Sequence, residues 1–171
     1  MRFIELAEKR CSIRGYKPDP VPEELLNEIL QAGNLAPTAK NLQPFHFIVV
    51  RDPVKLDELA VAYPAPFFRQ APVVIVICTE PAKGWTRDRY DGKNYCEVDA
   101  AIAIDHMTLA AADLGFGTCW IGAFDPVKVA NVMGLPEGIE PIAMLPLGYP
   151  NEAGRVKTRK PLDELVRYDC W

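Results

Sequence analysis

Apolar residues recur at helical spacing in several stretches of the chain, and these stretches predict its helices. Residues 22–35 carry an apolar stripe along one side, as an amphipathic helix does: Leu25, Leu26, Ile29 and Leu30. The stretch 98–114 is apolar on nearly every side, which is typical of a helix buried in a core or between subunits. The predicted helices are 2–9, 22–35, 53–59, 98–114, 126–133 and a short last one that begins at Pro161.

Shorter apolar runs rich in β-branched residues predict the strands. The run 73–78 is apolar throughout and is expected to be buried on both faces. The runs 45–50 and 139–147 are also apolar, although Pro141 and Pro146 place part of the latter at an edge or an end of the sheet. The glycines of 115–122 end a helix and lead into another strand, the reverse of the order in a dinucleotide-binding fingerprint.

The loop 38–43 is a candidate binding segment. Ala36-Pro37 ends the preceding helix and a strand begins at Phe45, so polar groups are held between two rigid elements. An ordinary helix-to-strand connection would have the same outline.

The loop 81–97 has a different character, with three aromatic residues among charges and glycines: Trp85, Tyr90 and Tyr95. A loop of this length is either a lid or disordered. Its aromatic content favours a lid.

Composition and charge narrow the class of protein. With 171 residues, 49% of them apolar and 25% charged, the chain is expected to form a single soluble domain, 1–171, around one core. The net charge of −4 argues against a general nucleic-acid or membrane binder. No apolar run approaches the length of a membrane span, and the N-terminal segment lacks the apolar core of a signal peptide.

The cysteines and histidines favour neither disulfides nor a metal site. The five cysteines are odd in number and contain no C-x-x-C pair, so we expect reduced thiols in a cytoplasmic protein. His46 and His106 are the only histidines, and neither has a partner at metal-ligand spacing.

Basic residues gather near both ends of the chain. Arg10, Ser12 and Arg14 alternate, so an extended backbone would point all three the same way, an arrangement that suits a phosphate group. A solvated basic face would explain the same pattern equally well. A second basic run follows in 154–160: Arg155, Lys157, Arg159 and Lys160.

Four motifs then occur in a fixed order. Residues 10–14 read R-C-S-I-R, residues 36–44 A-P-T-A-K-N-L-Q-P, residues 114–122 L-G-F-G-T-C-W-I-G, and residues 157–161 K-T-R-K-P. Together they resemble the R-R-S-x-R, A-P-S-x-x-N-x-Q-P, L-G-x-G-x-x-W-I-G and K-x-R signatures of the nitroreductase-like flavoprotein family in its short form. Each motif alone is weak evidence. All four, in order and on suitable elements, extend the resemblance over nearly the whole chain.

The resemblance implies FMN as the cofactor. It implies that Arg14 lies near the pyrimidine ring, where a guanidinium stabilises negative charge on the reduced flavin. The residues implied at the phosphate are Arg10, Ser12, Lys157 and Arg159. The full implied cofactor-binding set is Arg10, Cys11, Ser12, Arg14, Pro37, Thr38, Ala39, Asn41, Cys119, Trp120, Ile121, Gly122, Lys157 and Arg159.

The resemblance also implies a shared active site. The backbone N–H groups of Ile121 and Gly122 would face flavin N5 and O4, while the loop residues Pro37, Thr38 and Asn41 would approach the flavin of the other subunit. The implied fold is α+β, with a mainly antiparallel central sheet flanked by helices. The implied assembly is an intertwined homodimer with an exchanged C-terminal tail, in which the apolar helix 98–114 would lie at the interface.

The implied reaction is a ping-pong, two-electron reduction. NAD(P)H is the electron donor, and the acceptor is a small nitroaromatic, quinone or similar molecule. No catalytic side chain is required, because the flavin performs the electron chemistry. The sequence leaves the physiological acceptor and the choice between NADH and NADPH open.

The chain departs from the larger members of the family in the pocket wall and the pyrimidine site. Their Asn and Lys from the segment before the second strand have no counterpart except Arg69, and their helix Gln has none. Their long insertion is missing, so we expect Trp85 or Tyr90 of 81–97 to border the substrate pocket instead. Packing on the outer surface is the alternative for both.

Two other functions are compatible with the sequence. One is a flavin-binding protein without NAD(P)H oxidoreductase turnover, such as a sensor or a flavin-modifying relative. The other is a structural dimer without a cofactor.

Overall fold

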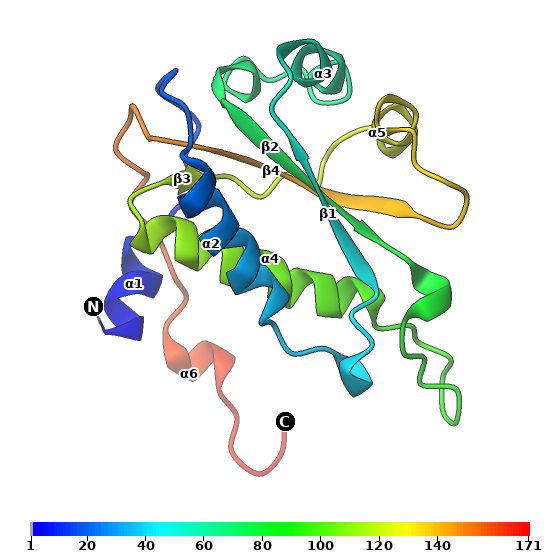
Figure 1. Cartoon of the computed structure of the whole chain (residues 1–171). Helices are drawn as coiled ribbons and strands as arrows, with labels where there is room; N and C mark the ends of the chain where they lie inside the picture. Colours follow the sequence, from blue (N-terminus) through cyan, green and yellow to red (C-terminus); the bar gives the residue numbers. More distant parts are fainter. Residues whose placement is uncertain (1) are drawn as a thin grey trace.

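The computed structural model describes residues 2–171, and a four-stranded sheet lies at its centre (Figure 1). The strands follow the order β1-β2-β4-β3, and all three ladders are antiparallel, as expected. Their bounds are β1 Phe45–Val50, β2 Val73–Thr79, β3 Gly117–Thr118 and β4 Glu140–Gly148.

Helices cover both faces of this sheet (Figure 1). Their bounds are α1 Phe3–Lys9, α2 Glu23–Asn34, α3 Pro53–Leu59, α4 Cys96–Asp113, α5 Pro126–Met133 and α6 Leu162–Leu165. Helices α2 and α4 pack on one face, whereas α3 and α5 pack on the other.

The side chains of β2 point alternately to the two faces of the sheet, and a hydrophobic core lies on each face. Its odd-numbered side chains, such as Ile75 and Ile77, pack in the cluster with α2 and α4. Its even-numbered side chains, such as Val74 and Val76, pack in the cluster with α3 and α5. Every residue of β2 is buried, which confirms the prediction of a strand covered on both faces.

Local sequence signals set several helix ends. The Asp52 carboxylate accepts the N–H of Lys55 at 3.0 Å, and the Asp125 carboxylate caps α5 in the same way. Gly134 ends α5 with a left-handed φ of 61°. Pro22, predicted inside the first turn, instead precedes α2 as its N-cap residue.

Helix α4 is longer at its start than predicted, because Cys96 and Glu97 belong to its first turn rather than to the preceding loop. Its buried side packs against α2 and the sheet through Ala100, Ile104, Met107 and Ala111. This core contact inside one chain accounts for most of its apolar character.

The prolines of β4 were expected to place part of the strand at an edge or an end of the sheet, and this expectation is confirmed in part. Only Leu147 and Gly148 pair with β3, so the start of β4, including Pro141, has a free edge within the described chain. Pro146, in contrast, lies opposite Val74 inside the sheet.

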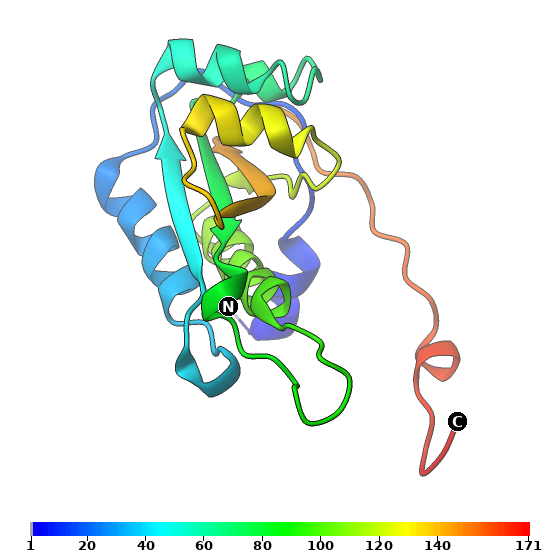
Figure 2. The same cartoon turned by 90° about the vertical axis from the view of Figure 1, so that its right-hand side faces the viewer.

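The C-terminal segment lies outside the packed sheet and its flanking helices (Figure 2). From about residue 151 it runs along the surface and ends with α6 and an exposed tail. Among the described residues, no helix combines the length and the apolar character needed to cross a bilayer.

Candidate functional site

The first motif, residues 10–14, lies extended beside the glycine-rich motif, residues 114–122. Ser12 forms a parallel bridge with Thr118, and the Ile13 N–H donates to the Thr118 carbonyl at 2.9 Å. Ile13 is buried, so the alternating side chains of Ser12 and Arg14 point to the opposite side. The extended backbone expected for residues 10–14 is therefore present.

A cavity of about 320 Å³ joins the two ends of the chain. We call it the basic cavity, because five basic residues line it together with Ser12: Arg10, Arg14, Arg155, Lys157 and Arg159. The structure thus brings together the residues that the motifs assigned to a phosphate. It adds Arg155, which belongs to the basic run 154–160 but is absent from the cofactor-binding set that the motifs imply.

The positive charge of the basic cavity is not compensated. Among residues 2–171, no carboxylate forms an ion pair with any of its five basic residues. The Arg10 Nε is buried and has no hydrogen-bond partner in the described chain. Burial, together with Arg10 and Arg159, lowers the pKa of Lys157. A bound anion would relieve all three features.

Two glycines allow the close backbone approach that builds this cavity. A Cβ at Gly154 would overlap the Cys11 Sγ, and a Cβ at Gly117 would lie 2.8 Å from the Cβ of Ile13. Glycine is therefore needed where the C-terminal segment and β3 cross the first motif.

Tyr16 anchors the end of the first motif. Its buried hydroxyl donates to the Ile13 carbonyl at 2.9 Å, and burial raises its pKa. The Gln70 amide oxygen accepts the Tyr16 N–H at 3.3 Å. Arg69, the basic candidate from this segment, instead pairs with Asp57. The segment before β2 thus supports the first motif through Gln70, a residue that the motifs do not single out.

In the glycine-rich motif, the Ile121 N–H was expected to face the flavin, and the structure differs at this point. The Ile121 N–H donates to the Met144 carbonyl at 3.0 Å, so it is not available to a ligand. Within residues 2–171 the Gly122 N–H has no acceptor, and the space above Gly122 is open. Cys119 is buried and Trp120 is 45% exposed. Gly122 alone of the pair can offer its N–H to a ligand.

The loop 38–43 has a strained backbone. Lys40, Asn41 and Gln43 all have left-handed φ angles, between 52° and 56°. Such conformations cost roughly 1–3 kcal/mol each and gather at functional sites. The Ala39 N–H donates to the Asp99 carboxylate at 2.9 Å, which ties the loop to the first turn of α4. A short 3₁₀ turn, Ala39–Asn41, occupies its centre.

Within one chain, this loop and the basic cavity lie at opposite ends of α4 (Figure 1). Asp99 holds the loop, whereas Ala112 in the last turn lines a small cavity with Arg10. At 1.5 Å per residue the two positions are about 20 Å apart. The structure therefore does not bring Pro37, Thr38 or Asn41 to the basic residues of the same chain.

The loop before α4 is a hairpin in the structure. Thr86 and Asn94 form an antiparallel bridge, and the Tyr95 N–H donates to the Trp85 carbonyl at 2.9 Å. Trp85 is half-buried against the Tyr95 ring, and Tyr90 is 77% exposed. Trp85 and Tyr90 both line a cavity of about 880 Å³, which we call the hairpin cavity.

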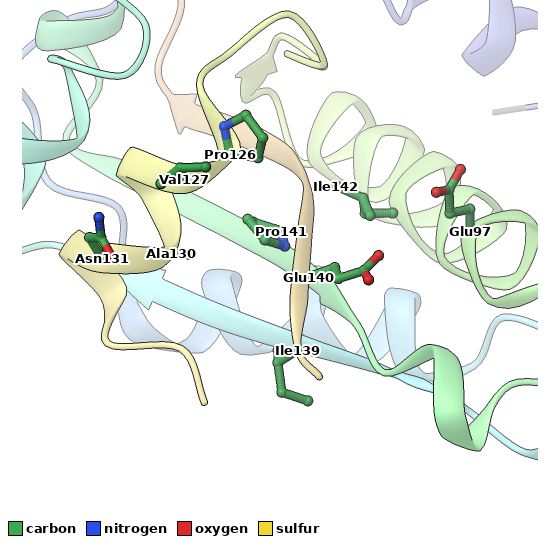
Figure 3. Close-up of a pocket in the computed structure, with 9 residues that line it drawn as sticks. All are labelled: Glu97, Pro126, Val127, Ala130, Asn131, Ile139, Glu140, Pro141 and Ile142. Atoms are coloured by element: carbon green, nitrogen blue, oxygen red, sulfur yellow. The ribbon is translucent and has the colours of Figure 1, made fainter. Parts of the chain in front are cut away.

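Another cavity, of about 570 Å³, lies between α5 and the free edge of β4 (Figure 3). Its lining combines the carboxylates Glu97 and Glu140 with apolar residues such as Ile139 and Ile142. It contains none of the motif residues and no basic group. It is therefore not the site to which the motifs point.

Comparisons with known proteins place the chain in a family. Residues 7–63 and 58–149 match the model of the Nitroreductase family. A Thermus thermophilus protein named NADH dehydrogenase is 33% identical over an alignment of 189 positions, which covers 94% of this chain and 92% of that protein. A Bacillus subtilis protein named FMN reductase (NAD(P)H) is 34% identical over an alignment of 177 positions, which covers 94% of this chain and 70% of that protein.

A solved structure agrees. The crystal structure of a nitroreductase family protein from Clostridium difficile matches with a TM-score of 0.88 and 36% identity, and each chain is covered completely. The chain belongs to the nitroreductase family, with the α+β fold of that family, and is an oxidoreductase of that type.

Proposed function

We propose that this protein is an FMN-dependent NAD(P)H oxidoreductase that reduces small nitroaromatic or quinone-like acceptors by two electrons, in a ping-pong cycle. The observation that carries the proposal is the uncompensated basic cavity, built from both ends of a nitroreductase-family chain. The relative named FMN reductase supports the choice of cofactor. FMN, when bound, accepts hydride from the nucleotide and passes the electrons to the acceptor.

The chain's own residues bind and orient the cofactor. Arg10, Lys157 and Arg159 hold the phosphate dianion, with Ser12 donating a hydrogen bond. Arg14 is exposed at the mouth of the basic cavity and lies toward the pyrimidine ring. The Gly122 N–H faces the flavin edge.

We further propose that the site is shared by two subunits of a homodimer. The separation of loop 38–43 from the basic cavity in one chain supports this assembly, because only a second copy can bring Pro37, Thr38 and Asn41 to the flavin. Along α4, Val98, Ile102 and Asp105 form a strip, spaced as one helix face, that the chain leaves exposed or half-buried.

The C-terminal tail is the second support for a dimer. It carries apolar side chains that its own chain leaves open to solvent: Val156, Leu162, Tyr168 and Trp171, each at least 75% exposed. Exposed apolar groups in such number mark an interaction surface. In the proposed dimer, the tails are exchanged between subunits.

Stopped-flow absorbance tests the function. The purified protein should be yellow, NADH or NADPH should bleach it without oxygen, and a quinone or nitroaromatic should restore the colour. Yellow protein that neither nucleotide bleaches would favour a flavin-binding protein without turnover. Protein that binds no FMN would contradict the proposal and favour a structural dimer.

A further inference from the structure

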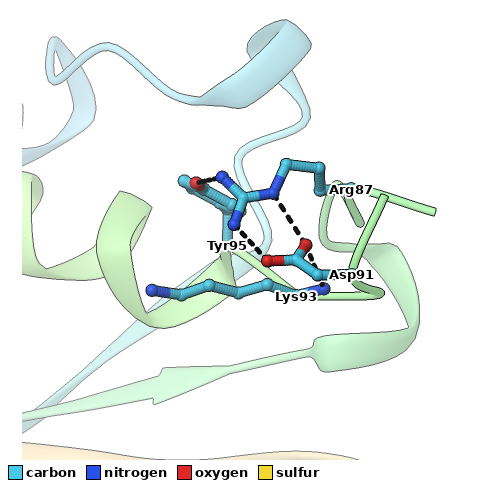
Figure 4. A network of polar contacts seen from close by, with 4 residues as sticks. All are labelled: Arg87, Asp91, Lys93 and Tyr95. Carbon is cyan, nitrogen blue, oxygen red and sulfur yellow. Dashed lines mark hydrogen bonds and ion pairs between the residues drawn. The ribbon is translucent and has the colours of Figure 1, made fainter. Parts of the chain in front are cut away.

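The hairpin that precedes α4 is braced by one ion-pair network (Figure 4). The Arg87 Nε donates to the Asp91 carboxylate at 2.7 Å, and its Nη1 donates to the Tyr95 hydroxyl at 2.9 Å. Lys93 Nζ lies 5.6 Å from the centre of the Tyr95 ring. The network holds the two arms of the hairpin together, so the side chains at its tip have a defined support.

The hairpin cavity has a surplus of positive charge. Three cations, Lys40, Arg87 and Arg89, and a single carboxylate, Asp88, line it. The charge of Arg87 is matched by Asp91, which lies outside the lining and whose pKa falls to about 2 through its hydrogen bonds with Arg87. Lys40 and Arg89 form no ion pair within residues 2–171.

Aromatic surface lies beside this charge. Trp85 and Tyr90 line the same cavity, and the Arg89 guanidinium lies 5.9 Å from the centre of the Tyr90 ring. Its volume of about 880 Å³ lies within the range of small-molecule sites. Flat rings stack on aromatic side chains, and an anionic substituent on such a ring would meet Lys40 and Arg89.

The cavity also contacts the loop that we assign to the cofactor site. Lys40 and Leu42 of that loop form one wall, and the bond from Ala39 to Asp99 fixes the wall to α4. A ligand in the hairpin cavity would therefore lie beside Thr38 and Asn41, which we propose approach the flavin.

We propose that the hairpin cavity is a substrate subsite for an aromatic molecule that carries an anionic group, with Lys40 and Arg89 as the residues that select it. The inference rests on the proposed function and deepens it by naming the substrate class. The anion has two possible sources. It is either the adenosine 2′-phosphate of NADPH or an acidic group on the acceptor.

The test compares charged and uncharged substrates on one variant. Lys40→Gln/Arg89→Gln is measured in the reductive half-reaction with NADPH against NADH, and in the oxidative half-reaction with anthraquinone-2-sulfonate against uncharged menadione. Lys83→Gln is the matched control, because Lys83 belongs to the same loop but pairs with Glu80 outside the cavity lining. The double variant should raise KM about 5-fold or more for the anionic member of one pair only.

The outcome identifies the source of the anion. A change with NADPH alone supports the nucleotide phosphate, and a change with the sulfonate alone supports an acidic acceptor. Equal KM values for the wild type and the double variant in both pairs would overturn the inference.

A binding measurement separates this inference from the proposed function. Anthraquinone-2-sulfonate should quench the fluorescence of Trp85, with weaker binding in the double variant and no such quenching in Trp85→Phe. This readout needs no turnover, so it stands even if no nucleotide bleaches the protein. Identical binding of the sulfonate by the wild type and the double variant would count against the subsite whether or not the enzyme turns over.

Discussion

The carboxylate of Asp99 accepts the backbone N–H of Ala39 at 2.9 Å, and this bond joins the strained loop 38–43 to the first turn of α4. Asp99 is 2% exposed, and its second oxygen, Oδ2, has no hydrogen-bond partner within residues 2–171. A buried aspartate in the first turn of α4 therefore positions a loop that we assign to the cofactor site.

Removing this acceptor should cost stability. We expect Asp99→Ala to lower the free energy of unfolding by about 1–3 kcal/mol, because the Ala39 N–H would be left without its partner. Asp99→Asn keeps an oxygen acceptor and should lose less. Urea unfolding curves of the three proteins measure the difference. An Ala variant as stable as the wild type would show that the bond does not hold the loop.

The basic cavity predicts phosphate anchoring from both ends of the chain. Arg10→Ala and Arg159→Ala should each weaken FMN binding roughly 10- to 100-fold, since a charge-assisted contact contributes about 1.5–3 kcal/mol. Titration of the apoprotein with FMN gives the affinities. Arg51→Ala is the control, because Arg51 pairs with Glu23 outside the cavity. Unchanged affinity in both cavity variants would remove the assignment.

The shared site predicts complementation between inactive subunits. Asn41→Ala and Arg10→Ala damage different halves of the site, so a mixed dimer should contain one intact site and one doubly damaged site. Mixing the two variants under conditions of subunit exchange should restore part of the activity. If mass spectrometry shows mixed dimers and no activity returns, the two residues serve the same subunit's flavin.

The lowered pKa of Lys157 predicts a pH dependence of FMN binding. Burial, Arg10 and Arg159 disfavour its charged form in the apoprotein, so the unfolded chain, with a lysine pKa near 10.5, binds more protons at alkaline pH. The stability of the apoprotein therefore gains from Lys157 as pH rises through that window. A bound phosphate favours the charged amine, so FMN binding takes up a proton and weakens as pH rises past the lowered pKa.

Affinity measured from neutral pH up to about pH 10.5, the ordinary lysine value, checks this sign. Lys157→Arg should flatten the dependence, because a guanidinium stays charged throughout. A wild-type affinity that stays constant or strengthens with rising pH would contradict the role of Lys157.

Much of the fold could be predicted because its signals are local. Asp52 and Asp125 cap helices by accepting N–H groups only two or three residues further along the chain. The residue types at the helix start were therefore sufficient to predict where these helices begin. The continuous apolar run of β2 predicted burial on both faces for a similar reason. The family resemblance implied which basic residues from the two ends of the chain would come together, and in the structure they line one cavity.

Contacts between distant segments were decided only by the tertiary structure. The sequence by itself could determine neither the bond of the Ile121 N–H to Met144 nor the pairing of Arg69 with Asp57. Only the packing of α4 against the loop gives Asp99 its partner, the Ala39 N–H. Residue type and spacing determine what a group can bond, but which donor meets which acceptor depends on how the strands and helices pack.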